Sequence, residues 1–231
     1  MIKPYYETPL GKLYHGDCLE IMPELEPVDL VLTDPPYGVD LGNHCDAKEK
    51  RKNVGLKKQK YTIYEDTHEN FIKIIVPSIK MAISKSKCGR AIVFCSGMRI
   101  WDYPRANTVS AIYLPSGQGS TGWGFQNFAH FLLYGTAPNM NKGRKNIALK
   151  SGARAEKNGH PCPKPIAWIS WLIQQWTEEN QIILDPFLGS GTAAVSCEHF
   201  KRKWIGIEIE EKYCEIAAKR IELERKQLKL F

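Results

Sequence analysis

The sequence predicts an α/β protein built on a mostly parallel sheet. Short apolar runs rich in β-branched residues alternate along the chain with longer segments whose apolar residues recur at helical spacing. Such alternation is typical of parallel strands joined by crossover helices. A second observation agrees with this class, because acidic and glycine-rich turns follow directly after apolar runs, as they do at the carboxyl ends of parallel strands.

The order of expected elements follows from these patterns. Strands are expected at residues 13–15, 28–33, 91–95, 108–114, 129–134, 182–184 and 204–207. Helices are expected at 70–84, with a kink at Pro77, and at 166–176, 192–199 and 211–229. The strands at 108–114 and 129–134, joined by a Gly- and Ser-containing loop at 115–124, suggest an antiparallel hairpin.

Length and composition indicate one soluble domain spanning residues 1–231. The chain has 43% hydrophobic and 25% charged residues, which is ordinary for a globular protein. It contains no apolar run of membrane-spanning length, and its start lacks a signal-peptide core, so we expect a cytoplasmic protein and no membrane partner. Seven scattered cysteines without a Cys-x-x-Cys pair, and histidines without paired spacing, give no reason to expect disulfides or a metal.

The segment Asp34-Pro35-Pro36-Tyr37 follows the expected strand at 28–33 and is a candidate catalytic site. An ionised Asp34 and the Pro35 carbonyl would offer two hydrogen-bond acceptors in a loop that the prolines stiffen. Tyr37 adds a flat face on which a planar ring could stack. Two acceptors and a stacking face suit a planar group that carries an NH2, such as adenine or cytosine, although the same residues are equally typical of a plain rigid turn.

A second candidate site follows the expected strand at 182–184. Asp185 begins a glycine-containing turn at 185–191, a helix is expected to start at Thr192, and Glu208 ends the next expected strand. An acid at that spacing suits the hydroxyls of a ribose, and glycines let the backbone approach a ligand. The turn lacks the third glycine of a dinucleotide site and adds a carboxylate. This favours S-adenosylmethionine, whose amino-acid tail is cationic, over a pyrophosphate cofactor.

Positive charge gathers in two expected loops. Lys and Arg exceed Asp and Glu by 32 to 25, and much of the excess falls within residues 39–66 and 137–159. Charge runs of this kind are commonly solvated surface, but beside a base-binding pocket they become candidates for phosphate contacts. The candidate DNA-binding residues are Lys48, Arg51, Lys52, Lys57, Lys58, Lys142, Arg144 and Lys145.

Taken together, these motifs resemble those of the DNA amino-methyltransferases that modify adenine at N6 or cytosine at N4. Residues 13–20 with 28–38 are similar to the amino end of that family, 185–192 to its cofactor loop, and 160–165 to the segment before that loop. Because the catalytic segment precedes the cofactor loop, the order resembles the circularly permuted β group. The resemblance implies a Rossmann-like methyltransferase fold with a mostly parallel seven-stranded sheet, an antiparallel edge hairpin and helices on both faces.

The resemblance also implies roles for individual residues. Asp34, Pro35, Pro36 and Tyr37 would be catalytic. The cofactor S-adenosylmethionine would be bound by Asp17, Cys18, Lys164, Asp185, Pro186, Phe187, Gly189, Ser190, Gly191, Thr192 and Glu208. Asp17 would contact the adenine of the cofactor, Glu208 its ribose, and residues 185–191 with Lys164 its methionine portion. Cys162-Pro163 replaces the Thr-Gln pair common before this lysine.

The expected function is methyl transfer to adenine N6 in a flipped-out DNA base, since Asp at the first motif position leans towards adenine in this family. N4-cytosine methylation, RNA adenine methylation and a non-catalytic cofactor-binding subunit remain alternatives. The interval 137–159 is too short for a separate recognition domain, so a homodimer and a short target site are expected. The class is that of prokaryotic, phage or mobile-element enzymes, including those of restriction-modification systems.

Overall fold

The computed structural model describes residues 2–40, 63–117, 120–121, 124–136, 146–156, 158–160 and 162–228. Its main sheet has the strand order β1-β2-β11-β10-β3-β4-β8-β5-β9. The strands are β1 (Tyr6–Glu7), β2 (Gly11–His15), β3 (Leu30–Thr33), β4 (Ala91–Cys95), β5 (Thr108–Tyr113), β8 (Phe128–Tyr134), β9 (Leu149–Lys150), β10 (Ile182–Asp185) and β11 (Lys203–Glu208). A separate pair, β6 (Ser120–Thr121) and β7 (Gly124–Phe125), lies within the loop expected at 115–124.

The sheet confirms the predicted class. Strands β2, β11, β10, β3 and β4 pair in parallel, and β8 runs antiparallel to both β4 and β5. The seven predicted strands form the body of the sheet, and the two-residue strands β1 and β9 extend its two edges. The β5–β8 hairpin lies near one edge, with β8 inserted between β4 and β5.

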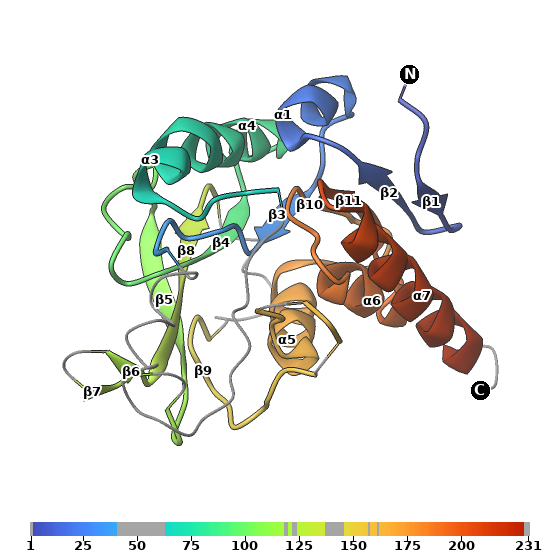
Figure 1. Ribbon diagram of the computed structural model, residues 1–231. Coiled ribbons are helices and arrows are strands. Elements are labelled where there is room, and N and C mark those ends of the chain that lie inside the picture. Colours follow the sequence, from blue (N-terminus) through green and yellow to red (C-terminus); the bar gives the residue numbers. More distant parts are fainter. Residues whose placement is uncertain are drawn as a thin grey trace.

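Helices cover both faces of the sheet, as Figure 1 shows. One layer contains α1 (Cys18–Ile21), the short 3-10 helix η1 (Met22–Glu24), α3 (His68–Asn70), η3 (Phe71–Ile75) and α4 (Val76–Lys85). The other contains α5 (Ile166–Trp176), α6 (Thr192–His199) and α7 (Glu211–Leu228). Because successive strand residues point to opposite faces, β3 sends Leu30 and Leu32 into the core beneath α5 and α6, and Val31 into the core beneath α4.

The helix predicted at 70–84 differs from expectation at Pro77. The structure has a π-helical stretch, η3, immediately before α4, in which the Val76 N–H donates to the Phe71 carbonyl five residues earlier. Pro77 then occupies the first turn of α4, where its missing N–H leaves no bond unmade. The proline at which a kink was predicted therefore lies just after a wider, π-helical turn, where α4 begins.

The fold brings the predicted strand ends to one edge of the sheet. Thr33, Asp185 and Glu208 are the last residues of β3, β10 and β11, three neighbouring parallel strands. Within the described residues, no helix is long and apolar enough to cross a membrane. The described residues also contain no cluster of His, Cys, Asp or Glu suited to a metal, and the six described cysteines are free thiols.

Candidate active site

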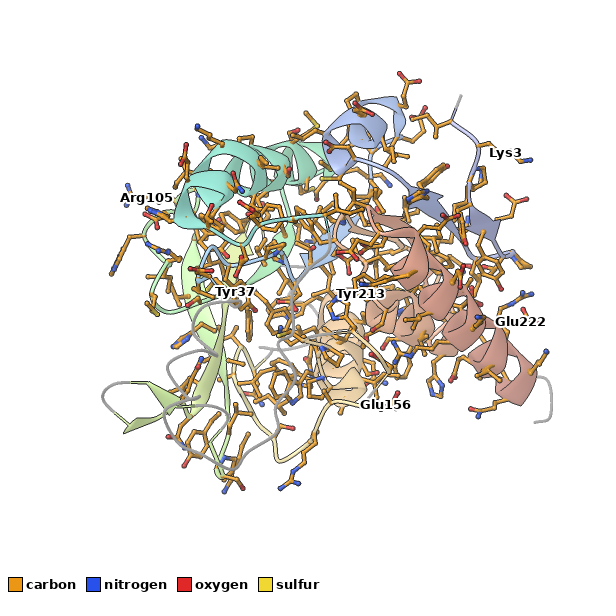
Figure 2. The ribbon with its side chains drawn as sticks, viewed as in Figure 1. Lys3, Tyr37, Arg105, Glu156, Tyr213 and Glu222 are labelled. Atoms are coloured by element: carbon orange, nitrogen blue, oxygen red, sulfur yellow. The ribbon has the colours of Figure 1, made fainter. Side chains whose placement is uncertain are left out.

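The catalytic candidate Asp34 follows β3, whose four residues are all buried. Both of its carboxylate oxygens have partners. The Tyr37 hydroxyl donates to Asp34 Oδ1 at 2.6 Å, and the Lys164 ammonium donates to Asp34 Oδ2 in an ion pair. The strand thus delivers the carboxylate to the sheet edge, and two side chains fix its orientation there. Figure 2 shows Tyr37 towards the middle of the molecule, between the two helical layers.

Gly38 closes the catalytic segment and is held on three sides. Its N–H donates to Asp66 Oδ1 at 2.7 Å, and Arg99 Nε donates to its carbonyl at 3.2 Å. Its φ is +65°, and a Cβ added there would lie 2.5 Å from the Phe71 Cβ. Both the backbone conformation and the space therefore demand glycine, so the segment from Asp34 to Gly38 is anchored at each end.

Asp185 is the most strongly perturbed acid of the site. It is 7% exposed, and its Oδ1 accepts from Thr33 Oγ1 at 2.7 Å and from the Phe187 N–H at 3.1 Å. Burial raises its pKa to about 7, and the neighbouring Asp34 and Glu208 carboxylates act in the same direction. Burial disfavours the ionised form of this carboxyl, and a cationic partner in the cavity would stabilise that form.

Glu208 organises the glycine turn from the neighbouring strand. Its Oε2 accepts from the Gly189 N–H and its Oε1 from the Glu210 N–H, both at 2.8 Å. Burial raises the pKa of Glu208, while the two backbone N–H groups oppose that rise. The carboxylate therefore fixes the turn at 185–191 and still lines the pocket with its remaining lone pairs.

Gly191 is required by the packing of the turn. It has φ +83° and caps α6, and an added Cβ would lie 2.8 Å from the Ala217 Cβ on α7. Arg220 on the same helix donates to the Ser190 carbonyl at 2.6 Å and to Thr192 Oγ1 at 3.2 Å. Helix α7 thus holds the predicted cofactor turn from behind.

Asp17 lies at the end of a neighbouring strand, two residues after β2. It is the N-cap of α1, and its Oδ1 accepts from the Leu19 N–H at 2.8 Å. It borders the same pocket as Glu208 and Asp34. Acids from four adjacent strands therefore converge on one cavity.

A single cavity gathers most of the predicted site residues. Its lining includes Asp17, Cys18, Asp34, Pro36, Lys164, Asp185, Pro186, Phe187, Gly189, Ser190, Thr192 and Glu208. Pro35, Tyr37 and Gly191 are not among its lining residues, although Tyr37 bonds to Asp34 at its border. The two constellations that the sequence separates by about 150 residues thus share one site.

Several functional candidates escaped the sequence reasoning. His160 packs against Gly189 and meets the Tyr213 ring edge-to-face at 4.7 Å, and burial lowers the pKa of His160 to about 4. Tyr213 and Glu210 also line the cavity. Sequence reasoning assigned His160 no site role beyond its place in the segment 160–165, which was the signal that could have identified it.

Trp101 is a further residue that the sequence did not single out. Its side chain is 92% exposed on the segment after β4, and Met98 beside it is 66% exposed. The segment is anchored, because Arg99 bonds to the Gly38 carbonyl and Asp102 pairs with His68 at 3.0 Å. A rigidly mounted, solvent-exposed indole therefore lies close in the fold to the catalytic segment.

The predicted DNA-contacting lysines and arginines fall outside the described residues. They are Lys48, Arg51, Lys52, Lys57 and Lys58 in the first loop, and Lys142, Arg144 and Lys145 in the second. At the border of the first loop, Asp66 accepts from the N–H groups of Gly38 and Val39 at 2.7 and 3.3 Å.

The fold and the cavity define the class of protein. A parallel sheet with an acidic, glycine-containing turn and a second acid on the next strand is the architecture of S-adenosylmethionine-dependent methyltransferases. Solved structures of such enzymes share the fold. The M1.HpyAVI-SAM complex matches with a TM-score of 0.64 and 24% identity over 91% of this chain and 98% of that one. The PvuII DNA methyltransferase, described as cytosine-N4-specific, matches with a TM-score of 0.68 and 19% identity over 95% and 89%.

Sequence comparison places the chain within this class. The DNA methylase family of N6 and N4 methyltransferases matches residues 100–219, so this chain belongs to that family and is an S-adenosylmethionine-dependent enzyme. Two similar relatives are the type II methyltransferases M2.LlaDCHI of Lactococcus lactis subsp. cremoris and M2.DpnII of Streptococcus pneumoniae. Each is 28% identical; the matches cover 96% and 97% of this chain and 93% and 94% of the relatives.

Proposed function

We propose that this chain is a single-domain, site-specific DNA methyltransferase that modifies the N6 amine of adenine in a flipped-out base. The observation that carries the proposal is the meeting of Asp34 with Asp185 and Glu208 at one cavity. An acceptor for an amine and a site for a methyl donor are thereby placed within reach of each other, as a direct transfer requires.

The residues of the cavity fit S-adenosylmethionine. When bound, this cofactor supplies an electrophilic methyl group on a positively charged sulfur. Asp185 would face its cationic amino-acid portion, since the buried carboxyl gains most from a positive partner. Glu208 and Asp17 would accept from ribose and adenine donors, and Phe187 and Ile209 offer apolar surface for the adenine ring.

Asp34 and Tyr37 would act on the target base. The exocyclic nitrogen of adenine is a poor nucleophile because its lone pair is delocalised into the ring. Hydrogen bonds from the amine to Asp34 and to the Pro35 carbonyl would draw the nitrogen towards tetrahedral geometry and aim its lone pair at the methyl group. A paired base cannot reach this cavity, so it must be extruded, with Tyr37 beside it as a stacking face.

Adenine is favoured over cytosine by Asp34 at the first position of the catalytic segment. N4-cytosine methylation is the second candidate, because one structure that shares the fold is described as specific for that base. Hydrolysis of methylated DNA to nucleosides, followed by mass spectrometry, separates N6-methyl-2′-deoxyadenosine from N4-methyl-2′-deoxycytidine. Parallel assays with labelled cofactor on DNA and on RNA test the remaining alternative, RNA adenine methylation.

DNA binding would use two kinds of contact. The basic residues of 39–66 and 137–159 would neutralise phosphates, which predicts affinity that falls steeply with salt. Trp101 would add a stacking contact near the cavity, because it is exposed on a segment that bonds to Gly38.

A homodimer is also proposed, with an exposed face of β5 and β8 as its interface. Val109, Tyr113 and Phe128 on β5 and β8 are 40–50% exposed, and the two aromatic rings lie 5.5 Å apart. An apolar surface of this kind is typical of a subunit contact. Light scattering coupled to size exclusion measures the mass directly, and a monomer at all concentrations would contradict the proposal.

The decisive test combines mapping with one substitution. Unmethylated plasmid DNA is treated with the enzyme and labelled S-adenosylmethionine, and modified positions are sequenced. Asp34→Ala should lower the rate of transfer by about 100-fold or more, the effect of removing one preorganised transition-state contact, while the cofactor dissociation constant stays nearly unchanged. Leu223→Ala, at a 60% exposed position on α7, is the matched control. Near-normal turnover by Asp34→Ala would refute the assignment.

A further inference from the structure

Lys164 occupies a place that the cofactor role expected from sequence does not explain. It lies two residues before the start of α5, with Pro165 between them, and its ammonium is directed to Asp34 rather than to the glycine turn. Its side chain is 16% exposed and that of Asp34 is 24% exposed, so the pair is largely withdrawn from water. The ammonium also lies 5.4 Å from the centre of the Tyr37 ring and 5.6 Å from that of Phe94.

These surroundings are those that an exocyclic amine requires. An amine needs an acceptor for its N–H groups and an aromatic face for the ring that carries it. In this structure Asp34 Oδ2 and the Tyr37 ring supply both to the Lys164 ammonium. The Lys164 ammonium bonds to Asp34 Oδ2 and lies over the Tyr37 ring, the place that the amine of a base stacked on Tyr37 would take, so the target amine and Lys164 compete for it.

We propose that Lys164 holds the place of the target amine on Asp34 and is displaced when the base enters. The inference rests on the proposed function, because it assumes that a flipped base reaches Asp34. Lys164 is then a positioning residue: it keeps a largely buried carboxylate partnered while no DNA is bound, and it yields that carboxylate to an arriving amine.

Displacement also bears on which bases the enzyme accepts. A ring that carries a carbonyl oxygen in place of the amine is repelled by Asp34 but could accept a hydrogen bond from Lys164. The lysine therefore weakens binding of the correct base and eases binding of the incorrect one. Removing it should increase the preference of the pocket for an amine.

The experiment measures this preference by equilibrium binding. Two duplexes carry the mapped recognition site, one with adenine and one with hypoxanthine at the target position, which replaces the amine by oxygen; cytosine and uracil are used if mapping finds cytosine. The amine preference is the ratio of the two dissociation constants, hypoxanthine over adenine. Lys164→Met should raise it by roughly 10- to 100-fold, the worth of a hydrogen bond between charged groups.

Further variants serve as controls. Lys164→Arg keeps a cation at Asp34 and should leave the preference within about threefold of the original protein, since the competing charge remains. In the Asp34→Asn background, Lys164→Met should change the preference less than it does in the unaltered protein, because the competition for the carboxylate is already absent. Lys164→Gln, which keeps polar donors without the charge, replaces the methionine variant if that one does not fold.

An unchanged amine preference in Lys164→Met and Lys164→Gln would overturn the inference. A loss of cofactor affinity with an unchanged preference would also overturn it and assign Lys164 to the cofactor. Failure of the proposed function is separate, because it appears as an absence of methylated DNA with the unaltered protein.

Discussion

Asp185 gives the sharpest prediction, because its protonation state should control cofactor affinity near neutral pH. The perturbation is pH itself, between 5.5 and 8, with Asp185→Asn as the companion variant. An asparagine can still accept from Thr33 Oγ1 and the Phe187 N–H through its oxygen, so the turn should keep its shape without the ionisable group.

The magnitude follows from the pKa. Burial raises the pKa of Asp185 from 3.8 to about 7. Between these two pH values only the folded protein holds the proton. Rising pH therefore lowers the free energy of unfolding of the cofactor-free protein by up to about 1.4 kcal/mol per pH unit, or about 4 kcal/mol between pH 3.8 and 7. Above pH 7 both states are ionised and the loss is complete. A cationic cofactor that restores the ordinary pKa of Asp185 releases this proton. As pH rises towards 7, the dissociation constant of S-adenosylmethionine should therefore fall by up to about tenfold per pH unit, and above pH 7 it should level off.

Calorimetric titration of S-adenosylmethionine at half-unit steps measures the slope, and thermal unfolding with and without cofactor should show a larger stabilisation at pH 8 than at pH 6. Asp185→Asn should bind the cofactor weakly with a flatter profile. Burial also raises the pKa of Glu208, so Glu208→Gln is the variant that separates the two acids. His160, with a pKa of about 4, stays neutral throughout this range. A dissociation constant that is flat between pH 5.5 and 7 would refute the reasoning.

Three other outcomes are expected. Gly191→Ala should lower the free energy of unfolding by about 2–5 kcal/mol in urea denaturation, because its positive φ and the contact with Ala217 both resist a Cβ; a loss under 1 kcal/mol would contradict this. Tyr37→Phe should slow methyl transfer about tenfold in single-turnover assays by removing the bond to the catalytic carboxylate, and an unchanged rate would count against that bond. Trp101→Ala should weaken duplex binding roughly 5- to 100-fold by fluorescence anisotropy without changing cofactor affinity, whereas Leu223→Ala should change neither; equal binding by both variants would exclude the stacking contact.

The sequence predicted the sheet and the edge at which the site lies because local patterns encode both. Apolar runs identify strands, and the acids directly after them can only lie at the strand ends. Asp34, Asp185 and Glu208 were therefore found without coordinates. The turn before Pro77 was not predicted, because no local sequence pattern indicates the π-helical stretch that precedes this proline.

Contacts between distant segments were beyond sequence reasoning. Lys164 and Asp34 are 130 residues apart, and their pairing depends on how the segment before α5 lies across the end of β3. Gly191 was expected at the cofactor from its motif, and the structure adds a packing constraint that the motif did not reveal, because Ala217 on α7 fills the space of a Cβ. A motif indicates which residues gather, but the packing of the helices decides what each one touches.

The charges around the cavity also predict that its affinity for the ligand falls once the methyl group has been transferred. Asp34, Asp185 and Glu208 face one cavity with Lys164 as the ammonium that pairs with Asp34, so the site carries an excess of negative charge. S-adenosylmethionine brings a positive sulfur, and the product S-adenosylhomocysteine does not. The product keeps the ammonium that Asp185 would face and loses only the charge on sulfur, so the cavity acids lose part of their attraction for the ligand on transfer. We expect the product to bind more weakly than the cofactor, and Asp185→Asn to weaken both ligands in competition titrations because both carry the ammonium; a product that binds more tightly than the cofactor at pH 8 would show that apolar contacts, rather than these carboxylates, determine affinity.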